Sequence, residues 1–163
     1  MNWDALGSVA ELLGTLLVLV SVLYLAVQVK QNTNAVKAAS HHAVTDTFNS
    51  VSSLIAQDTD VARRWRLGNE QSPDLTEDER VSYGFMCIMY TRVFETIYYQ
   101  RKMGTMEEQL FVAEEQTLKW GLSQPGYIEW WESNPISFSG EYREYVNSLI
   151  REMQAGTAFE ATD

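Results

Sequence analysis

The chain has 163 residues, of which 22 are acidic and 12 are basic, so its formal net charge is −10. Such an acidic chain is poorly suited to bind the phosphate backbone of nucleic acid or to adhere to anionic lipid. Its single cysteine, Cys87, excludes an internal disulfide and a thiolate metal cluster, and its apolar neighbours predict a core position.

The first element in chain order is an apolar stretch from Leu12 to Val29, which we predict to be a membrane-spanning helix. It holds eighteen residues without a formal charge, and twelve of them are Leu or Val. A helix of that length measures about 27 Å, close to the thickness of the hydrocarbon core of a bilayer. The alternatives are a signal peptide, which normally has a basic start and a small-residue cleavage site, and a helix buried in a soluble core, which would need a large surrounding domain.

The charges on either side of this stretch predict its orientation. Asp4 and Glu11 precede it, whereas Lys30 and Lys37 follow it. Because positive residues stay on the cytoplasmic side, we expect the N-terminus outside and the remaining chain in the cytoplasm.

One face of the predicted span carries small and polar side chains, and its opposite face carries Leu and Val. At 100° per residue this small-residue face contains Gly7, Glu11, Gly14, Ser21 and Gln28. Four of these residues recur every seven positions, a repeat that favours a left-handed helix crossing. Small residues mark the places where membrane helices approach closely, so we predict that this face binds a transmembrane helix of another subunit. The alternative is that the small residues share one side by chance.

After Lys30 the pattern becomes amphipathic, which predicts that the helix continues to Gln57. A break at the polar residues 31–34 is the alternative. We therefore divide the chain into a transmembrane anchor (1–30), a helical extension (31–57), a helical domain (58–155) and a frayed tail (156–163).

Several short motifs resemble those of a widespread, uncharacterised group of short bacterial single-pass membrane proteins. They are Tyr24-Leu25-Ala26, Gln28, Lys30-Gln31-Asn32-Thr33 and Ala35-Val36-Lys37-Ala38, followed by Arg92-Val93-Phe94-Glu95, Tyr98-Tyr99-Gln100 and Trp130-Trp131. The resemblance implies a location in the bacterial inner membrane and a helical domain, and it adds no functional residue.

The helical domain opens with a short helix and a long one. Asp58 can cap a short helix over 61–67 that stops at Gly68. Thr76 and Glu79 match a capping box, which predicts the start of a helix ending near Gly104. Its apolar residues cover more than one side, so we expect it to be the central helix of an antiparallel bundle: Val81, Phe85, Met86, Ile88, Met89, Val93, Phe94 and Ile97.

Three further helices are predicted after Gly104. Thr105 and Glu108 match a second capping box, whose helix would run to about Leu122 and make contacts through Leu110, Phe111, Ala113, Leu118 and Trp120. Pro125 suits the first turn of a short helix. Ser137 or Ser139 then starts the last helix, which we expect to end near Gln154.

Four groups of side chains are candidates for chemistry. His41 and His42 point about 100° apart on a helix, so one metal cannot readily take both, and we expect no cofactor or metal. Arg92 and Glu95 can satisfy each other when partly buried, although Glu95 is also the best candidate for an acid–base group. The third group is a basic cluster (Arg63, Arg64 and Arg66), which either balances an acidic protein or meets anionic lipid head groups or a partner's acidic surface. The fourth is an aromatic cluster (Trp120, Tyr127, Trp130 and Trp131). Core packing is the ordinary role of that aromatic cluster, and partner binding through Trp130 and Trp131 is the alternative.

These observations predict an all-α, single-pass membrane protein that is not an enzyme. We expect an accessory or scaffold subunit of a larger inner-membrane complex for electron transport, photosynthesis or transport. The alternative is a small membrane-tethered enzyme or sensor with a site at Glu95 or at His41 and His42.

Overall fold

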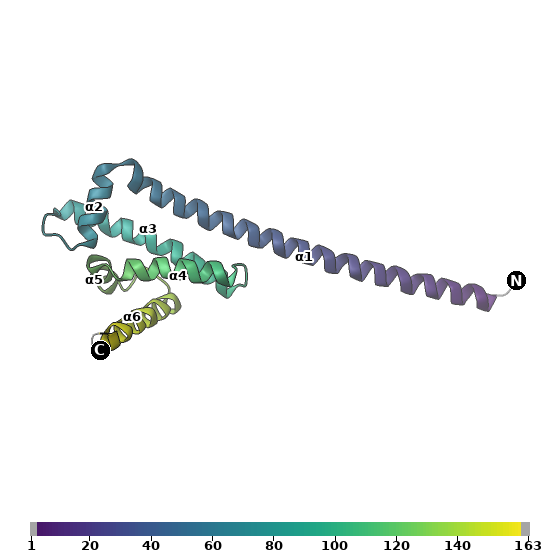
Figure 1. Ribbon diagram of the computed structural model, residues 1–163. Coiled ribbons are helices and arrows are strands. Elements are labelled where there is room, and N and C mark those ends of the chain that lie inside the picture. The colour runs from purple at the N-terminus through teal and green to yellow at the C-terminus, as the bar shows by residue number, and fades with distance from the viewer. Residues whose placement is uncertain (1–2, 161–163) are drawn as a thin grey trace. The chain divides into compact units, whose positions relative to one another are not determined.

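The computed structural model describes residues 3–160, and this part of the chain forms helices α1 to α6 and contains no strand (Figure 1). The predicted all-α class is therefore confirmed. By its internal contacts the chain divides into two compact units, of which the first ends at Ala39 and the second begins at Ser40.

Helix α1 runs from Trp3 to Gln57 without interruption, so the predicted continuation of the first helix is confirmed and residues 31–34 do not break it. Its last third belongs to the second unit, because Val44 is buried and Phe48 and Val51 pack on the same core. The packing boundary therefore lies near residue 40, within the expected helical extension.

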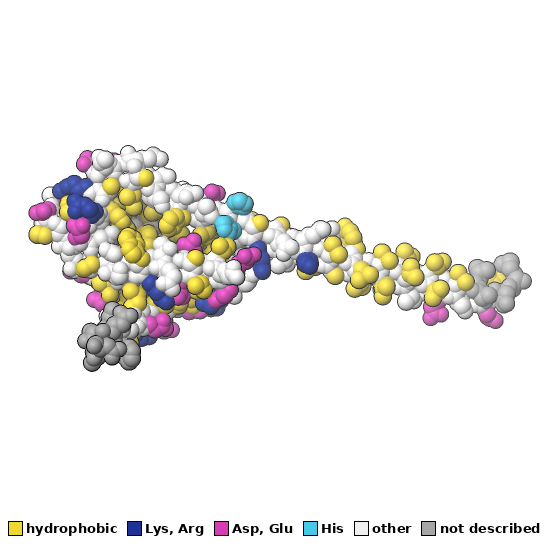
Figure 2. Space-filling view, in the orientation of Figure 1, with side chains coloured by type: hydrophobic (Ala, Val, Ile, Leu, Met, Phe, Trp, Pro, Cys, Tyr) yellow, Lys and Arg dark blue, Asp and Glu magenta, His cyan; other side chains and the backbone are white. Residues whose placement is uncertain are grey.

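In the first unit, the stretch from Leu12 to Val29 is open to the surroundings. Its large apolar side chains are between 53% and 67% exposed, and Figure 2 shows hydrophobic side chains gathered along this part of the helix. By length and composition α1 is the one helix among the described residues that can cross a membrane, and none of its most apolar window is buried. A helix buried in a soluble core would show the opposite pattern.

Helix α2 spans Thr59–Asn69, two residues more at each end than the expected helix over 61–67. Its start is set as predicted by Asp58, whose carboxylate accepts hydrogen bonds from the backbone N–H groups of Asp60 and Val61. Gly68 does not stop this helix, contrary to prediction. It is a buried residue inside α2, where a Cβ would lie 2.2 Å from the ring of Tyr83.

Helix α3 spans Glu77–Lys102 and contributes more buried residues than any other helix, which confirms it as the central helix. The capping box is present: the backbone N–H of Glu79 donates to Thr76 Oγ1 (3.3 Å), and the backbone N–H of Thr76 donates to the Glu79 carboxylate (2.9 Å). The apolar residues of α3 do not all enter the core, because Val81, Phe85 and Met89 are exposed.

Helix α4 spans Glu108–Leu122 and ends where predicted, but its predicted capping box is wrong. Thr105 instead closes the end of α3, since its backbone N–H and its hydroxyl both donate to the carbonyl of Gln100. Gly104, with a φ of +71°, makes this turn possible. Phe111 and Leu118 are buried as expected, whereas Ala113 and Trp120 are exposed.

Helices α5 (Pro125–Ser133) and α6 (Gly140–Glu160) complete the second unit. Pro125 occupies the first turn of α5 as predicted. Ser139 Oγ accepts a hydrogen bond from the backbone N–H of Tyr142, which fits the predicted start of the last helix. Helix α6 continues past Gly156 to Glu160, beyond its expected end, and the last part of the expected tail (161–163) lies outside the described residues.

The core of the second unit is strongly aromatic. Tyr127, Trp131 and Tyr142 are each at most 1% exposed and belong to the same buried cluster as Cys87. The hydroxyls of Tyr127 and the fully buried Thr91 share a hydrogen bond of 2.5 Å. Helix α3 packs against α2, α4 and α5, so one side of the central helix faces this core (Figure 1).

Candidate functional site

The small-residue face of α1 is exposed along its whole length. A Cβ built on Gly7 or Gly14 would meet nothing within 4 Å, so both positions leave open space beside the helix. The hydroxyl of Ser21 donates to the carbonyl of Leu17 (2.8 Å), and that of Thr15 donates to the carbonyl of Glu11 (2.9 Å). Because these hydroxyls are satisfied within the helix, the face can lie in an apolar environment at little cost.

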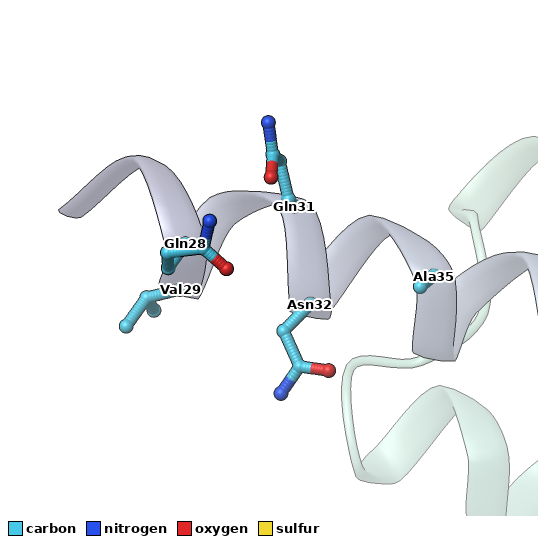
Figure 3. Close-up of a pocket in the computed structure, with 5 residues that line it drawn as sticks. All are labelled: Gln28, Val29, Gln31, Asn32 and Ala35. Carbon is cyan, nitrogen blue, oxygen red and sulfur yellow. The ribbon is translucent and has the colours of Figure 1, made fainter. Parts of the chain in front are cut away.

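At the C-terminal end of the apolar stretch, α1 carries a group of carboxamide side chains. An open depression is lined by Gln28, Val29, Gln31, Asn32 and Ala35 (Figure 3). The side chains of Gln31 and Asn32 point to opposite sides of the helix, so they do not converge on one ligand. This arrangement suits a boundary between lipid and water better than a closed binding site.

In the second unit, Arg92 and Glu95 form the ion pair expected from their spacing. Glu95 is 8% exposed, and its second carboxylate oxygen accepts a hydrogen bond from the backbone N–H of Ser139 (3.0 Å). Arg92 also donates to the carbonyl of Ser137 (2.6 Å) and lies over the ring of Phe138. The mutual pairing is the structural role expected from the sequence. In addition, both side chains attach the segment before α6 to α3.

The two histidines lie near the start of the second unit and diverge. Their ring planes are 77° apart, with centroids separated by 6.3 Å. The ring of His41 shares a hydrogen bond of 3.3 Å with the hydroxyl of Thr45. It also lines a small cavity of about 60 Å³ together with Glu114 on α4. Burial raises the pKa of the Glu114 carboxyl, and the nearby His41 opposes that rise.

The thiol of Cys87 is part of the core and not a reactive group. It is fully buried, and burial raises its pKa to about 12. The reactive thiolate form is therefore disfavoured at neutral pH, as the sequence predicted.

The aromatic cluster near the C-terminus does not form one exposed surface. Trp131 is 1% exposed and donates from Nε1 to the side chain of Asn147 (3.0 Å), so it belongs to the core and offers no surface to a partner. Trp130 is only partly buried, and Trp120 is 57% exposed on α4. Trp130 and Trp131 differ in burial because adjacent residues point about 100° apart on a helix, and Trp120 lies on another helix.

The basic cluster on α2 is largely neutralised by neighbouring carboxylates. Arg63 pairs with Glu79 (2.7 Å), and Arg66 pairs with Glu70 (3.0 Å). Hydrogen bonds from the Thr76 backbone and from Arg63 lower the pKa of Glu79 to about 2. This pairing favours the surface-balancing role over contact with lipid head groups.

Helix α3 carries an exposed apolar row, whereas its sequence pattern predicts these residues in the core. Val81 is 58%, Phe85 63% and Met89 38% exposed, and the three recur at intervals of four residues. The signal available in the sequence is their charged flanks, because Asp78 and Arg92 fall on the same side of the helix.

Within residues 3–160, no cluster of three or more His, Cys, Asp or Glu side chains is arranged to hold a metal ion. No protein-family model, curated protein or solved structure matches the chain.

Proposed function

We propose that this chain is a single-pass protein of the bacterial inner membrane and acts as an accessory or scaffold subunit of a larger membrane assembly. In this proposal the stretch from Leu12 to Val29 spans the bilayer, and the helical domain lies in the cytoplasm. The small-residue face binds a transmembrane helix of another subunit, and the domain holds a position beside the membrane without carrying out a reaction.

The observation that carries this proposal is the exposure of the apolar stretch. Eighteen residues whose large apolar side chains are more than half exposed would be unstable in water, at about 25 cal/mol per Å² of apolar surface. Insertion into a bilayer removes that cost and satisfies every backbone group, because the stretch is helical throughout. The absence of Lys and Arg before Lys30 supports an outside N-terminus.

The small-residue face supports docking over simple anchoring. Gly7 and Gly14 leave open space where another helix backbone can approach closely. Glu11 lies on the same face, and an anchor surrounded only by lipid gains nothing from a carboxylate at the edge of its span.

Topology and co-purification together test the proposal. A reporter that is active only in the periplasm should be inactive when fused after Asp163 and active when fused before Met1. Tagged protein extracted from native membranes in mild detergent should bring larger membrane proteins with it in a fixed ratio. An active C-terminal periplasmic reporter would contradict the orientation, and recovery of the chain alone would contradict the role as a subunit.

A further inference from the structure

The solvent-facing side of α3 carries apolar side chains that do not pack in the core of the second unit. Helix α3 is the central helix, yet Val81, Phe85 and Met89 form an apolar row on its outer side. Contiguous exposed apolar surface on a folded domain commonly marks an interaction site.

A side chain from outside α3 widens this row. A Cβ on Gly84 would lie 3.5 Å from Nε1 of the partly buried Trp130, so α5 borders the row on one side. We call Val81, Phe85, Met89 and Trp130 the α3 surface.

The charges around the α3 surface are mainly acidic. Glu77 and Asp78 are exposed at its N-terminal end, and Glu129 and Glu132 are exposed on α5. On the basic side, Arg92 is already paired with Glu95, which leaves Arg80 as the other nearby cation on α3. Arg143 of α6 donates to the carbonyl of Asn134 (2.9 Å) and lies over the ring of Trp131, so it is held against α5 and is outnumbered by the four carboxylates. The surface therefore combines an apolar centre with a negative rim.

The apolar centre and negative rim allow three candidate binding partners to be compared: a second copy of the chain, an anionic bilayer and a basic amphipathic helix. A second copy would bring the same acidic rim against itself, and an anionic bilayer would repel it. A helix with an apolar stripe and flanking Lys or Arg residues matches both the centre and the rim. Segments that flank transmembrane helices on the cytoplasmic side are rich in Lys and Arg, so a membrane partner would supply such a helix.

We propose that the α3 surface binds a basic amphipathic helix that flanks a transmembrane span of the partner subunit. This inference rests on the proposed function, because it requires a membrane partner beside a cytoplasmic domain. It adds a second contact to the one made by the small-residue face. Two contacts on one chain raise the effective concentration of each, so neither needs to be strong alone.

Photo-crosslinking of the full chain in native membranes tests the inference. A benzophenone amino acid replaces Phe85 in one variant, Val112 in a control and Gln28 in a second control. Val112 is a matched exposed apolar position on α4, at 49% exposure. Gln28 lies on the small-residue face, is exposed and already carries a long side chain, so the probe there reports on docking of the span without filling the space beside Gly14. We expect an adduct from Phe85 whose crosslinked peptide is a basic amphipathic segment next to a span, and none from Val112. Combining the Phe85 probe with Glu77→Lys and Asp78→Lys should lower its adduct yield about tenfold.

Several outcomes would overturn the inference. They are no adduct at Phe85 while Gln28 crosslinks, an adduct of Phe85 with a second copy or with lipid alone, a partner peptide that is acidic, and a yield that the two lysines leave unchanged. If neither Phe85 nor Gln28 crosslinks to another protein, the proposed function itself fails, and the two failures are thereby distinguished.

Discussion

Gly126 of α5 lies directly against the main chain of Gly68 in α2, since a Cβ on Gly126 would lie 1.8 Å from the Gly68 carbonyl oxygen. On the other side, a Cβ on Gly68 would lie 2.2 Å from the ring of Tyr83 on α3. Two glycines thus allow α2 to approach both α5 and α3, and this close packing fixes the arrangement of the three helices around the core.

The first prediction follows from this contact. Gly126→Ala has to push α2 and α5 apart, so we expect it to destabilise the protein by at least about 2 kcal/mol. Chemical denaturation of detergent-solubilised protein, followed by circular dichroism, measures the change. Gly140→Ala is the matched control, because a Cβ there meets nothing within 4 Å and the variant should unfold like the wild type or slightly later. Equal unfolding of the two variants would show that the helices do not approach as closely as described.

The second prediction separates the two threonines that the sequence treats alike. Thr76→Ala removes a helix cap and should cost about 0.5–2 kcal/mol. Thr105→Ala leaves the start of α4 intact and removes one hydrogen bond to the Gln100 carbonyl, so its cost should be about 1 kcal/mol or less. Amide hydrogen exchange distinguishes the mechanisms. Thr76→Ala should increase exchange in the first turn of α3, and Thr105→Ala should increase it at the end of α3. Faster exchange in the first turn of α4 after Thr105→Ala would show that Thr105 caps α4 and would contradict this assignment.

These two cases show what the sequence can and cannot predict. Thr76 and Pro125 mark helix starts correctly because capping depends on chemistry within one turn. Gly68 fits the pattern of a stop signal, but its role is to leave room for the ring of Tyr83, a residue fifteen positions later in the chain. Thr105 fits the capping pattern, but the preceding turn at Gly104 directs it back to α3.

The candidate sites also combine features that the sequence predicts with features that depend on the folded chain. The spacing of Arg92 and Glu95 predicts their pairing, whereas the attachment of Ser137 and Ser139 to that pair requires the folded chain. When a helix has apolar residues on more than one side, the sequence alone does not determine which of them face the core. For that reason Phe85 is expected in the core but is exposed, and Trp131, for which the sequence leaves core packing and partner binding open, is buried.

The third prediction concerns Glu95. Glu95→Gln loses the ion pair with Arg92 and weakens the hydrogen bond to the backbone of Ser139, so we expect a loss of about 1.5–3 kcal/mol. Hydrogen exchange in the first turn of α6 should rise in the same variant. Unchanged stability and unchanged exchange would favour the alternative in which Glu95 is held for acid–base chemistry.

The fourth prediction concerns pH and Glu114. A carboxyl whose pKa is raised on folding stabilises the folded state when it is protonated, and this contribution is lost as pH rises through the folded pKa. Between pH 4.5 and 7, wild type should therefore lose stability relative to Glu114→Gln, which carries no charge at any pH. Denaturation midpoints across that range provide the measurement, with the exposed Glu152→Gln as control. A constant difference between wild type and Glu114→Gln over the whole range would contradict the burial of this carboxylate.

The fifth prediction addresses the central claim, that the span docks on another subunit through its small-residue face. Gly14 lies on that face and Leu16 lies on the opposite, Leu-rich side. Gly14→Leu fits the isolated helix, because nothing lies within 4 Å of a Cβ at that position, but it should separate the partner helix. Leu16→Ile keeps the same hydrophobic character on the other side, and both variants should insert into the membrane.

Recovery of the partner assembly with tagged protein, after mild detergent extraction and at matched membrane levels, tests this claim most directly. We expect Gly14→Leu to lose the partner and Leu16→Ile to keep it at the level of wild type. Equal recovery with both variants would contradict the docking face and leave the span as an anchor only.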